Sequence, residues 1–458
     1  MAVRPLARRR RVLLVTTAVT AGLAALLHVP AASSSPAPTE TTWERGRVDA
    51  HSDGDTPYVD IWGDGTRTRQ PVRLIDVQAT EIAHTVGGTR SGKDWCHGLA
   101  AKRRAESLMP EGSVVRLRSL RRSNAADFSQ RLGRTVHVKR RDGSWRNPQT
   151  VMLREGHVMW FPHPSEWAHN AEYHLMSEKA ARAGVNIWNR TSCGSGPRQE
   201  AALRVWVHHD ANGADDADNA HRNDEYVIVR NDGGAGEVDL GGWFLRDTAL
   251  WMYRFPEGTR LPAGAELRVH TGTGSDTARD LYWGRDRSVF GERESAVQGF
   301  DLSHHMGDGA FLLDPQGDFR AWTTYPCVLS CADPTGDDLV IDDVDYDPDG
   351  ADTGHERVVL HNTGASTVSL SHLQLRSWPW NYVFPTGTAL AAGHRLTVHV
   401  VASAQHPENT DSDLYWFPST TAVLDNGTDE VDVSTLDDVP VACHRWNHTT
   451  GPSATCQH

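Results

Sequence analysis

The second half of the chain repeats itself, and this repeat constrains the fold more than any other feature of the 458-residue sequence. Short β-type runs recur about 130 residues further along. The matching pairs are Glu225–Asn231 with Glu356–Asn362, Tyr253–Thr259 with Tyr382–Thr388, and Asp280–Trp283 with Asp413–Trp416. Because these runs are bounded by Gly and Pro turns, they predict two tandem all-β sandwiches, at 199–330 and 335–446.

The first half, at 43–193, has a different pattern. The strand candidates are Tyr58–Trp62, Val72–Val77, Val114–Leu120 and Thr135–Lys139. The helix candidates are Asp94–Met109, with Asp94 as its cap, Gln149–Glu155 and Asn170–Ala183. Short strands with interleaved helices predict an α+β barrel of the OB type. The fold class is therefore multidomain, an α+β OB-fold barrel followed by two all-β sandwiches.

Residues 1–32 have the order of a secretory signal peptide. Arg8–Arg11 precede the apolar run Val12–Leu27, and small residues follow Pro30. A membrane anchor is the alternative, but the run is short and contains threonines. The adjacent arginines leave general and twin-arginine export both open. Residues 33–42 predict a linker rich in Ser, Pro and Thr. Since no second hydrophobic span follows, we expect a secreted, extracellular protein without a membrane span.

Six cysteines agree with export, because an even number outside the cytosol favours disulfides. Cys96 and Cys193 are the two in the first half, and we expect them to pair. The other four, Cys327, Cys331, Cys443 and Cys456, should form two more bridges whose pairing the sequence leaves open. A zinc site at the closely spaced pair is the alternative, but no His pair at finger spacing accompanies it.

Charge divides sharply between the two halves. Residues 41–190 hold 24 Lys+Arg against 17 Asp+Glu, whereas residues 191–458 hold 17 against 41. A basic first domain suits a polyanionic partner such as nucleic acid, and the acidic repeats should repel one. For the repeats we expect an extracellular protein or a surface as partner.

The chemistry-bearing residues of the first half lie in a fixed order. Asp53-Gly-Asp-Thr is followed by the segment from Arg73 to Glu81, and then by Leu-Gly-Arg ending at Arg134. Two guanidiniums can hold a phosphate by bidentate contacts. A glutamate can orient or activate water, and an acidic turn can hold a hard cation. These are the parts needed to hydrolyse a phosphodiester.

Residues 47–188 resemble the staphylococcal-nuclease family on these motifs, together with the closing sequence Val185-Asn-Ile-Trp. The resemblance implies Arg73 and Arg134 as phosphate ligands, with Glu81 as the base or the residue that orients water. It also implies one calcium ion, held by Asp55 and a second carboxylate. The two repeats resemble lamin-tail domains on their Glu-x-Val…Asn and Phe-Pro-x-Gly-Thr signatures. This resemblance implies that both sandwiches are immunoglobulin-like.

One ligand position departs from the nuclease pattern. Gln78 stands where the family has its second carboxylate ligand, and it offers a neutral oxygen only. Ala79 could still contribute its backbone carbonyl. Asp76, two residues earlier on the same strand face, could compensate if the strand end bends. We therefore expect a weakened calcium site made by Asp55, Gln78, Ala79 and Asp76.

Acidic loops precede both repeats, near Asp210 and near Asp347, and each has an Asp-x-(Asn/Asp)-Gly-Ala-Asp core. They lack EF-hand spacing, and we expect a structural calcium in each, with a solvated loop as the alternative. For the whole chain, the expected function is a secreted, calcium-assisted endonuclease acting on DNA, with RNA left open. By the resemblance it would leave 3′-phosphates. The alternative is a weakened nuclease fold that serves as a nucleic-acid or surface binding module.

Overall fold

A computed structural model describes residues 39–446 with internal gaps, and residues 1–38 and 447–458 lie outside it. The gaps are 87–88, 92–93, 123–130, 164–165, 195–199, 210–221, 235, 250, 291–306, 330–333, 351, 353, 378–379, 402–406, 418–421 and 437–438. The predicted signal peptide and most of the predicted linker lie outside the described residues. No helix in the described part of the chain is long and apolar enough to cross a membrane.

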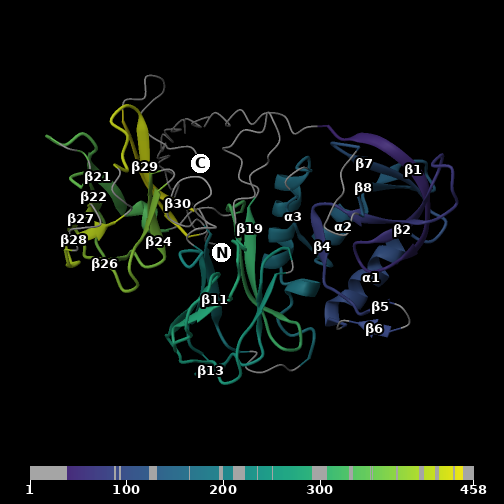
Figure 1. Ribbon diagram of the computed structural model, residues 1–458, viewed down its shortest axis with the longest axis horizontal. Coiled ribbons are helices and arrows are strands. Elements are labelled where there is room, and N and C mark those ends of the chain that lie inside the picture. Colours follow the sequence, from purple (N-terminus) through teal and green to yellow (C-terminus); the bar gives the residue numbers. More distant parts are fainter. Residues whose placement is uncertain are drawn as a thin grey trace, which may run out of the picture. The chain divides into compact units, whose positions relative to one another are not determined.

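The first domain is a closed five-stranded barrel, as the sequence predicts (Figure 1). Its strands follow the order β3-β2-β1-β7-β8, and a parallel pairing of β3 with β8 closes the sheet; β9 extends it beyond β8. The strands are β1 (Thr41–His51), β2 (Pro57–Ile61), β3 (Gln70–Leu74), β7 (Val114–Ser119), β8 (Leu132–Lys139) and β9 (Trp145–Arg146). Two smaller ladders join β4 (Val77–Ala79) to β10 (Val158–Trp160) and β5 (His84–Val86) to β6 (Thr89–Ser91).

Alternation of apolar and polar residues forms the barrel core. Along β7, Val115 and Leu117 are fully buried, and the alternate residues Val114, Arg116 and Arg118 face outward. Val48 on β1, Val59 on β2 and Val136 on β8 fill the same core. Burial of such side chains contributes about 1.5–3 kcal/mol each, so this pattern is sufficient to set the register of the barrel strands.

Three helices cover the barrel close to their predicted positions: α1 (Cys96–Leu108), α2 (Pro148–Arg154) and α3 (Asn170–Arg182), followed by the 3-10 turn η1 (Asn186–Trp188). The predicted cap of α1 is wrong. Trp95 occupies the N-cap position without a side-chain hydrogen bond, and Asp94 instead accepts a hydrogen bond from the Ala83 amide at 2.9 Å. The predicted disulfide between Cys96 and Cys193 is confirmed.

The predicted strand Val72–Val77 is interrupted. β3 ends at Leu74, Asp76 takes a left-handed backbone conformation with φ of 60°, and β4 starts at Val77. Few residues other than Gly, Asn and Asp adopt this conformation readily. The side chains of β3, before the turn, and those of β4, after it, therefore lie in different surroundings.

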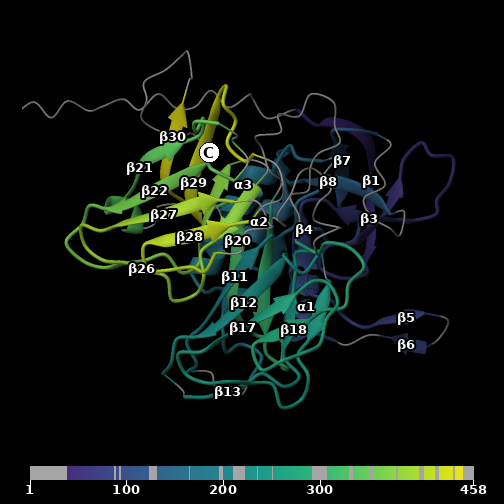
Figure 2. The same cartoon turned by 60° about the vertical axis from the view of Figure 1, so that its left-hand side comes forward.

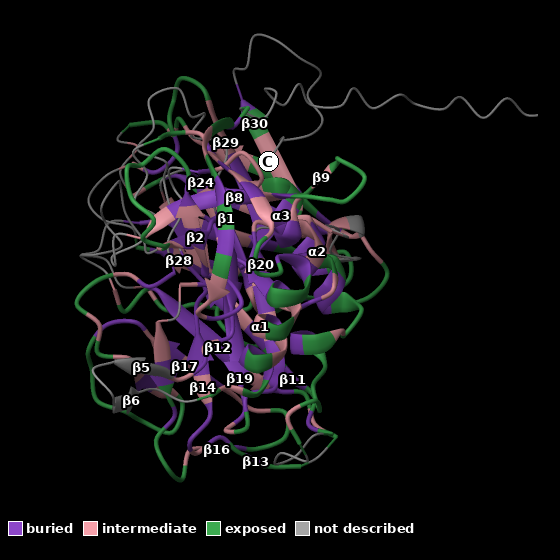
Figure 3. Ribbon diagram, turned by 90° about the vertical axis from the view of Figure 1, so that its right-hand side faces the viewer, coloured by how far each residue is buried: buried purple, intermediate pink, exposed green. Residues whose placement is uncertain are grey.

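Each half of the acidic region is a sandwich of two four-stranded sheets, which confirms the predicted fold class. The first sandwich has strand orders β11-β12-β17-β18 and β15-β14-β19-β20, and the second has β21-β22-β27-β28 and β25-β24-β29-β30 (Figure 2). The two sets of orders correspond strand for strand. Sandwich strands are largely buried, and the turns that join them are largely exposed (Figure 3).

The strands of the first sandwich are β11 (Leu203–His208), β12 (Tyr226–Asn231), β13 (Val238–Asp239), β14 (Phe244–Arg246), β15 (Met252–Arg254), β16 (Arg260–Leu261), β17 (Glu266–His270), β18 (Asp280–Tyr282), β19 (Asp308–Leu313) and β20 (Phe319–Tyr325). The 3-10 turn η2 (Pro334–Asp337) precedes the second sandwich. The strands of the second sandwich are β21 (Leu339–Asp345), β22 (Arg357–Asn362), β23 (Val368–Ser369), β24 (Leu373–Ser377), β25 (Trp380–Val383), β26 (Ala389–Leu390), β27 (Arg395–Val400), β28 (Asp413–Trp416), β29 (Asp429–Thr435) and β30 (Pro440–Trp446).

The repeated Glu and Asn residues have the same structural task in both sandwiches. Glu225 accepts hydrogen bonds from two consecutive backbone amides, and Glu356 does likewise. Asn231 and Asn362 each donate to the carbonyl of a leucine on the short neighbouring strand. Buried polar groups need such partners, so these residues recur because they satisfy loop backbone inside the sandwich.

Cys327 and Cys443 in the second half are disulfide-bonded. Cys331 and Cys456 lie outside the described residues, so the expected two bridges stay a prediction and their pairing stays open.

Candidate functional site

Arg73 lies at the end of β3 with only 4% of its surface exposed. Its Nη1 donates to the Leu74 carbonyl and its Nη2 to Gln78 Oε1, both at 2.7 Å. Nη1 is also 3.2 Å from Asp55 Oδ2. The turn at Asp76 makes this contact with Gln78 feasible. Three residues predicted for one site are thus in direct contact.

Asp55 belongs to the tight loop between β1 and β2. Its Oδ2 accepts a hydrogen bond from the Ala79 amide at 2.7 Å, and its carbonyl accepts one from the Leu74 amide. Burial raises the pKa of Asp55 to about 6, Arg73 opposes this rise, and Asp53 adds to it. Because burial favours the protonated form of Asp55, a second cation nearby would strongly stabilise its charged form.

Helix α1 holds both the Asp55 loop and the Glu81 segment through close glycine contacts. A Cβ at Gly54 would lie 2.7 Å from the Ala101 Cβ, so the loop packs directly on the helix. A Cβ at Gly98 would lie 2.6 Å from the Glu81 carbonyl, which also accepts a hydrogen bond from the Trp95 amide at 3.1 Å. Both acidic segments are therefore positioned by the same rigid element.

Gln78 connects Arg73 to Glu81. While its Oε1 accepts from Arg73, its Nε2 donates to Glu81 Oε1 at 3.2 Å and to the Ala79 carbonyl at 2.9 Å. Gln78 is 5% exposed, whereas Glu81 is half-buried. The amide therefore bridges a buried cation and a carboxylate that reaches solvent.

Arg134 lies on β8, next to β3, but in different surroundings. It is fully buried and bidentate with Glu44 on β1, at 2.8 Å from Nε to Oε2 and 3.1 Å from Nη2 to Oε1. It also donates to the carbonyls of Gly133 and Arg122. No contact within the described residues joins Arg134 to Arg73, Asp55 or Glu81. Its predicted role therefore requires exchange of Glu44 for the phosphate.

Asp76 does not join Asp55. It is 1% exposed, and neither carboxylate oxygen has a hydrogen-bond partner in the part of the chain that is described. Burial raises the pKa of Asp76 well above its usual range, and the charges of Glu40 and Glu166 raise it further, against Arg73. Asp76 therefore lies among other acids inside the barrel domain.

These acids were not predicted by the sequence motifs. Glu166 accepts hydrogen bonds from the Leu120 and Arg121 amides, and burial raises its pKa to about 7. Glu40 accepts from the Thr135 hydroxyl and lies 3.3 Å from His169 Nε2. They come from distant segments with no shared spacing, so only the folded chain reveals the group. Glu44 has the same origin, since nothing in β1 marks it as the partner of Arg134.

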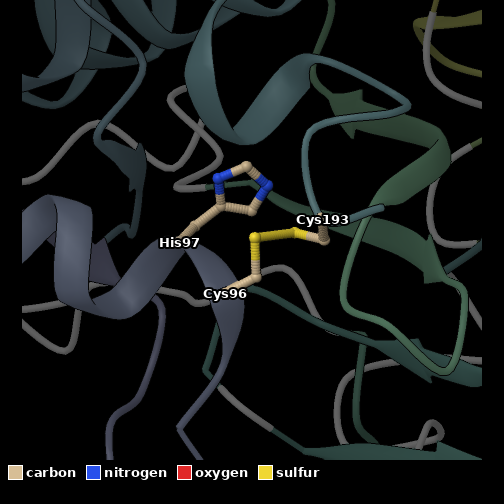
Figure 4. Close-up of side chains that lie close together, drawn as sticks. All are labelled: Cys96, His97 and Cys193. Atoms are coloured by element: carbon tan, nitrogen blue, oxygen red, sulfur yellow. A yellow bond between two sulfur atoms is a disulfide. The ribbon is translucent and has the colours of Figure 1, made fainter. Parts of the chain in front are cut away.

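One group of potential metal ligands lies outside this region. Cys96, His97 and Cys193 have ligand atoms within 4.8 Å of one another (Figure 4). Because the two cysteines form a disulfide, no thiolate is available to a metal there. Burial lowers the pKa of His97 to about 4, so this imidazole is a neutral core group beside the disulfide.

Calcium fits the Arg73 region only as a site of low charge. Among the described residues, no three His, Cys, Asp or Glu ligand atoms there come within 4.8 Å of one another. The donors are the Asp55 and Glu81 carboxylates with the oxygens of Gln78 and Ala79. All are hard oxygen ligands of the kind that Ca²⁺ accepts, but two carboxylates give weaker binding than three.

The acidic loop near Asp347 has a partner of its own. Asn426 Nδ2 donates to Asp347 at 3.3 Å and to Asp352 at 2.9 Å. The matching loop near Asp210 lies outside the described residues. The predicted calcium in these loops stays a prediction.

We predict that Asp76→Asn stabilises the protein increasingly as pH rises. In the folded protein Asp76 holds its proton at pH values where the unfolded chain has lost it, so stability falls as pH increases above about 4. Asn accepts the left-handed backbone and never ionises. The stabilisation by Asp76→Asn should therefore be larger at pH 7 than at pH 4. Thermal midpoints by calorimetry at both pH values measure it.

Asp142→Asn is the matched control. Hydrogen bonds from Ser144 lower the pKa of this exposed carboxyl, so its substitution should have a small effect of opposite sign. A gain for Asp76→Asn that is the same at both pH values would contradict the assignment of a buried, protonated carboxyl.

Comparison with known protein families matches the lamin tail domain at residues 207–327 and again at 332–446. No nuclease family matches the chain. A comparison with curated proteins finds no match. The two matched segments together span more than half of the sequence and coincide with the two β-sandwiches. The chain therefore belongs to the family of proteins that carry lamin tail domains.

Proposed function

We propose that the barrel domain is a secreted, calcium-assisted endonuclease that hydrolyses DNA, with RNA as a second substrate class. The observation that carries this proposal is the direct chain of contacts from Asp55 through Arg73 and Gln78 to Glu81. It combines a permanent cation, a buried acid and a half-buried acid at one end of a closed barrel. Hydrolysis of a phosphodiester needs these charges in one place.

In this proposal each side chain has one role. Arg73 binds a non-bridging phosphate oxygen and stabilises the charge that builds up in the transition state. Glu81 orients the attacking water and accepts its proton. Asp55, with the Gln78 and Ala79 oxygens, would hold Ca²⁺, which when bound neutralises phosphate charge. Arg134 would add a second guanidinium once it releases Glu44.

In the free protein, Gln78 occupies the hydrogen-bonding position on Arg73 that a phosphate oxygen would take. Its Oε1 occupies the Nη2 donor of Arg73, which a phosphate oxygen would take on binding. A neutral amide holds the guanidinium more weakly than a carboxylate would. The exchange therefore costs less here than the release of Arg134 from Glu44. Substrate binding at Arg73 is expected to come first.

The confirmed disulfide Cys96–Cys193 supports an extracellular site of action. Disulfides persist in oxidising compartments, where millimolar calcium would offset a low-charge site. Cys96 is the first residue of α1, the helix that positions the Asp55 loop and the Glu81 segment. The covalent link therefore supports the site as well as the domain.

The alternative is a binding module with no catalysis. One observation favours it: Arg134 is fully buried and its guanidinium is bidentate with Glu44. If that pair never opens, the barrel has a single phosphate ligand and a neutral residue at the second metal position. The lamin tail domains would then be the functional part.

Substitution of the two central residues tests the proposal. Glu81→Gln and Arg73→Ala should each lower the rate of cleavage of single- and double-stranded DNA at least about 100-fold, because each removes a group needed in the transition state. The assay is digestion of labelled DNA with Ca²⁺ and with EDTA.

The partly buried ion pair of Arg104 and Glu155, in the same domain but outside the Arg73 contacts, provides matched controls. Arg104→Ala and Glu155→Gln should cleave at the wild-type rate. Unchanged cleavage in Glu81→Gln and Arg73→Ala would refute the site, and no cleavage by wild type with any divalent ion would favour the binding module.

A second test restores the missing charge. Gln78→Asp should lower the calcium concentration for half-maximal cleavage about tenfold, since a further carboxylate beside Asp55 strengthens Ca²⁺ binding. Without calcium the same variant should have a lower thermal midpoint, because it sets a new carboxylate against Glu81. Gln78→Asn is the matched neutral control. A Gln78→Asp protein with unchanged calcium dependence would show that calcium does not bind at this position.

A further inference from the structure

The outward face of the barrel sheet places cations directly opposite one another. Arg45 on β1 pairs with Arg116 on β7, and Arg116 pairs with His137 on β8. In the next row, Arg47 on β1 pairs with Val114, on the same face. Opposed residues in antiparallel strands have Cβ atoms about 4.5–5.5 Å apart, and like charges there destabilise the sheet. The opposed cations therefore repel one another, and this repulsion does not stabilise the fold.

Few acids neutralise these cations. Arg45, Arg47, Arg116 and Lys139 form no ion pair within the described part of the chain. Asp60 pairs with Arg47 across β1 and β2, without an ion pair. The other acid on this face of β1, Asp49, is bound to Arg69 at 2.8 Å, and the Arg118 guanidinium donates to the Glu40 carbonyl. A net positive field remains over β1, β7 and β8, strands that lie side by side (Figure 1).

Two tryptophans accompany the cations. Trp62 is 47% exposed, and its amide donates to the Arg45 carbonyl at 2.8 Å, which places it level with Arg45. The Arg116 guanidinium lies over the Trp145 ring, 3.9 Å from its centroid, so the aromatic holds it against the sheet. The Trp62 ring is thus exposed beside a preorganised row of charge.

His137 lies in the same row. Burial is the main cause that lowers the pKa of this histidine; Arg118 and Arg116 lower it further, and Glu40 opposes them. The two arginines therefore disfavour a further positive charge at this position.

We propose that the arginine face, defined as Arg45, Arg47, Arg116, Lys139 and Trp62, binds a single strand of nucleic acid. Phosphates neutralise the opposed guanidiniums, and one unpaired base stacks on Trp62. A duplex would satisfy the charges but would offer no free base to the tryptophan. The proposal deepens the proposed function and rests on it for the identity of the polyanion. None of these residues belongs to the Arg73 site.

Binding to a labelled strand tests the proposal on the full mature chain. The probe is a fluorescein-labelled oligothymidine of about 15 nucleotides, followed by anisotropy in EDTA so that no cleavage occurs. Arg45→Gln/Arg116→Gln should weaken binding about tenfold and reduce the salt dependence by roughly 1.4 in log–log slope, or about 0.7 for each charge. Trp62→Ala should weaken binding about fivefold or more.

The control is Arg254→Gln/Arg260→Gln, two exposed arginines of the first lamin tail domain that have acidic partners. It changes the net charge equally and should bind within about twofold of wild type. Equal weakening by both double variants, or none by either, would overturn the proposal. So would tighter binding of a matched duplex or a sulfated polysaccharide that is insensitive to Trp62→Ala.

Thermal midpoints distinguish a variant that has lost only the binding surface from one that has lost its fold. Since the double variant relieves repulsion, its midpoint should not fall. Glu81→Gln should bind the oligothymidine as wild type does, which separates the two proposals. Wild type that binds without ever cleaving contradicts the nuclease alone, and cleavage with unchanged binding in the double variant contradicts the arginine face alone.

Discussion

The parallel pairing of β3 with β8 is the constraint on which the rest of the barrel domain depends. It joins two strands that are distant in sequence and closes the sheet, so neither strand is left as a free edge. It also sets Leu74 level with Arg134 and ends β3 where the chain turns at Asp76. Both predicted phosphate ligands therefore lie on strands paired across the closure, but in separate hydrogen-bond networks.

Burial of charge decides what each network can do. Removing one partner of a buried ion pair costs about 3–5 kcal/mol, because the other charge is left without compensation. Arg134 meets this demand with the Glu44 carboxylate, whereas Arg73 has one 3.2 Å contact with the Asp55 carboxylate and otherwise donates to two neutral groups, Gln78 Oε1 and the Leu74 carbonyl. The second network is the easier one to open. In the proposed nuclease, the glutamine at position 78 would thus lower metal affinity and at the same time leave Arg73 more accessible to a phosphate.

Much of the fold follows from local patterns in the sequence. The repeat predicted two sandwiches, alternation along Tyr58–Trp62 predicted a barrel strand, and the lone cysteines of the first half predicted their bond. The failures are of a different kind. Asp94 was predicted to cap the helix, but its carboxylate accepts a hydrogen bond from the distant Ala83 amide instead. The predicted strand through Asp76 is interrupted because Asp76 adopts a left-handed turn conformation, which aspartate tolerates. The Arg134–Glu44 pair and the acids around Asp76 join segments far apart in the chain, where no spacing rule applies.

The central claim is that the barrel domain cleaves phosphodiesters by attack of water. The most direct measurement is digestion of a single-stranded oligonucleotide in ¹⁸O-labelled water with calcium, followed by mass spectrometry of the products. The account predicts fragments with a 3′-phosphate that carries one ¹⁸O atom, and partner fragments with a 5′-hydroxyl. Intact oligonucleotide, or fragments whose label is on a 5′-phosphate, would contradict it.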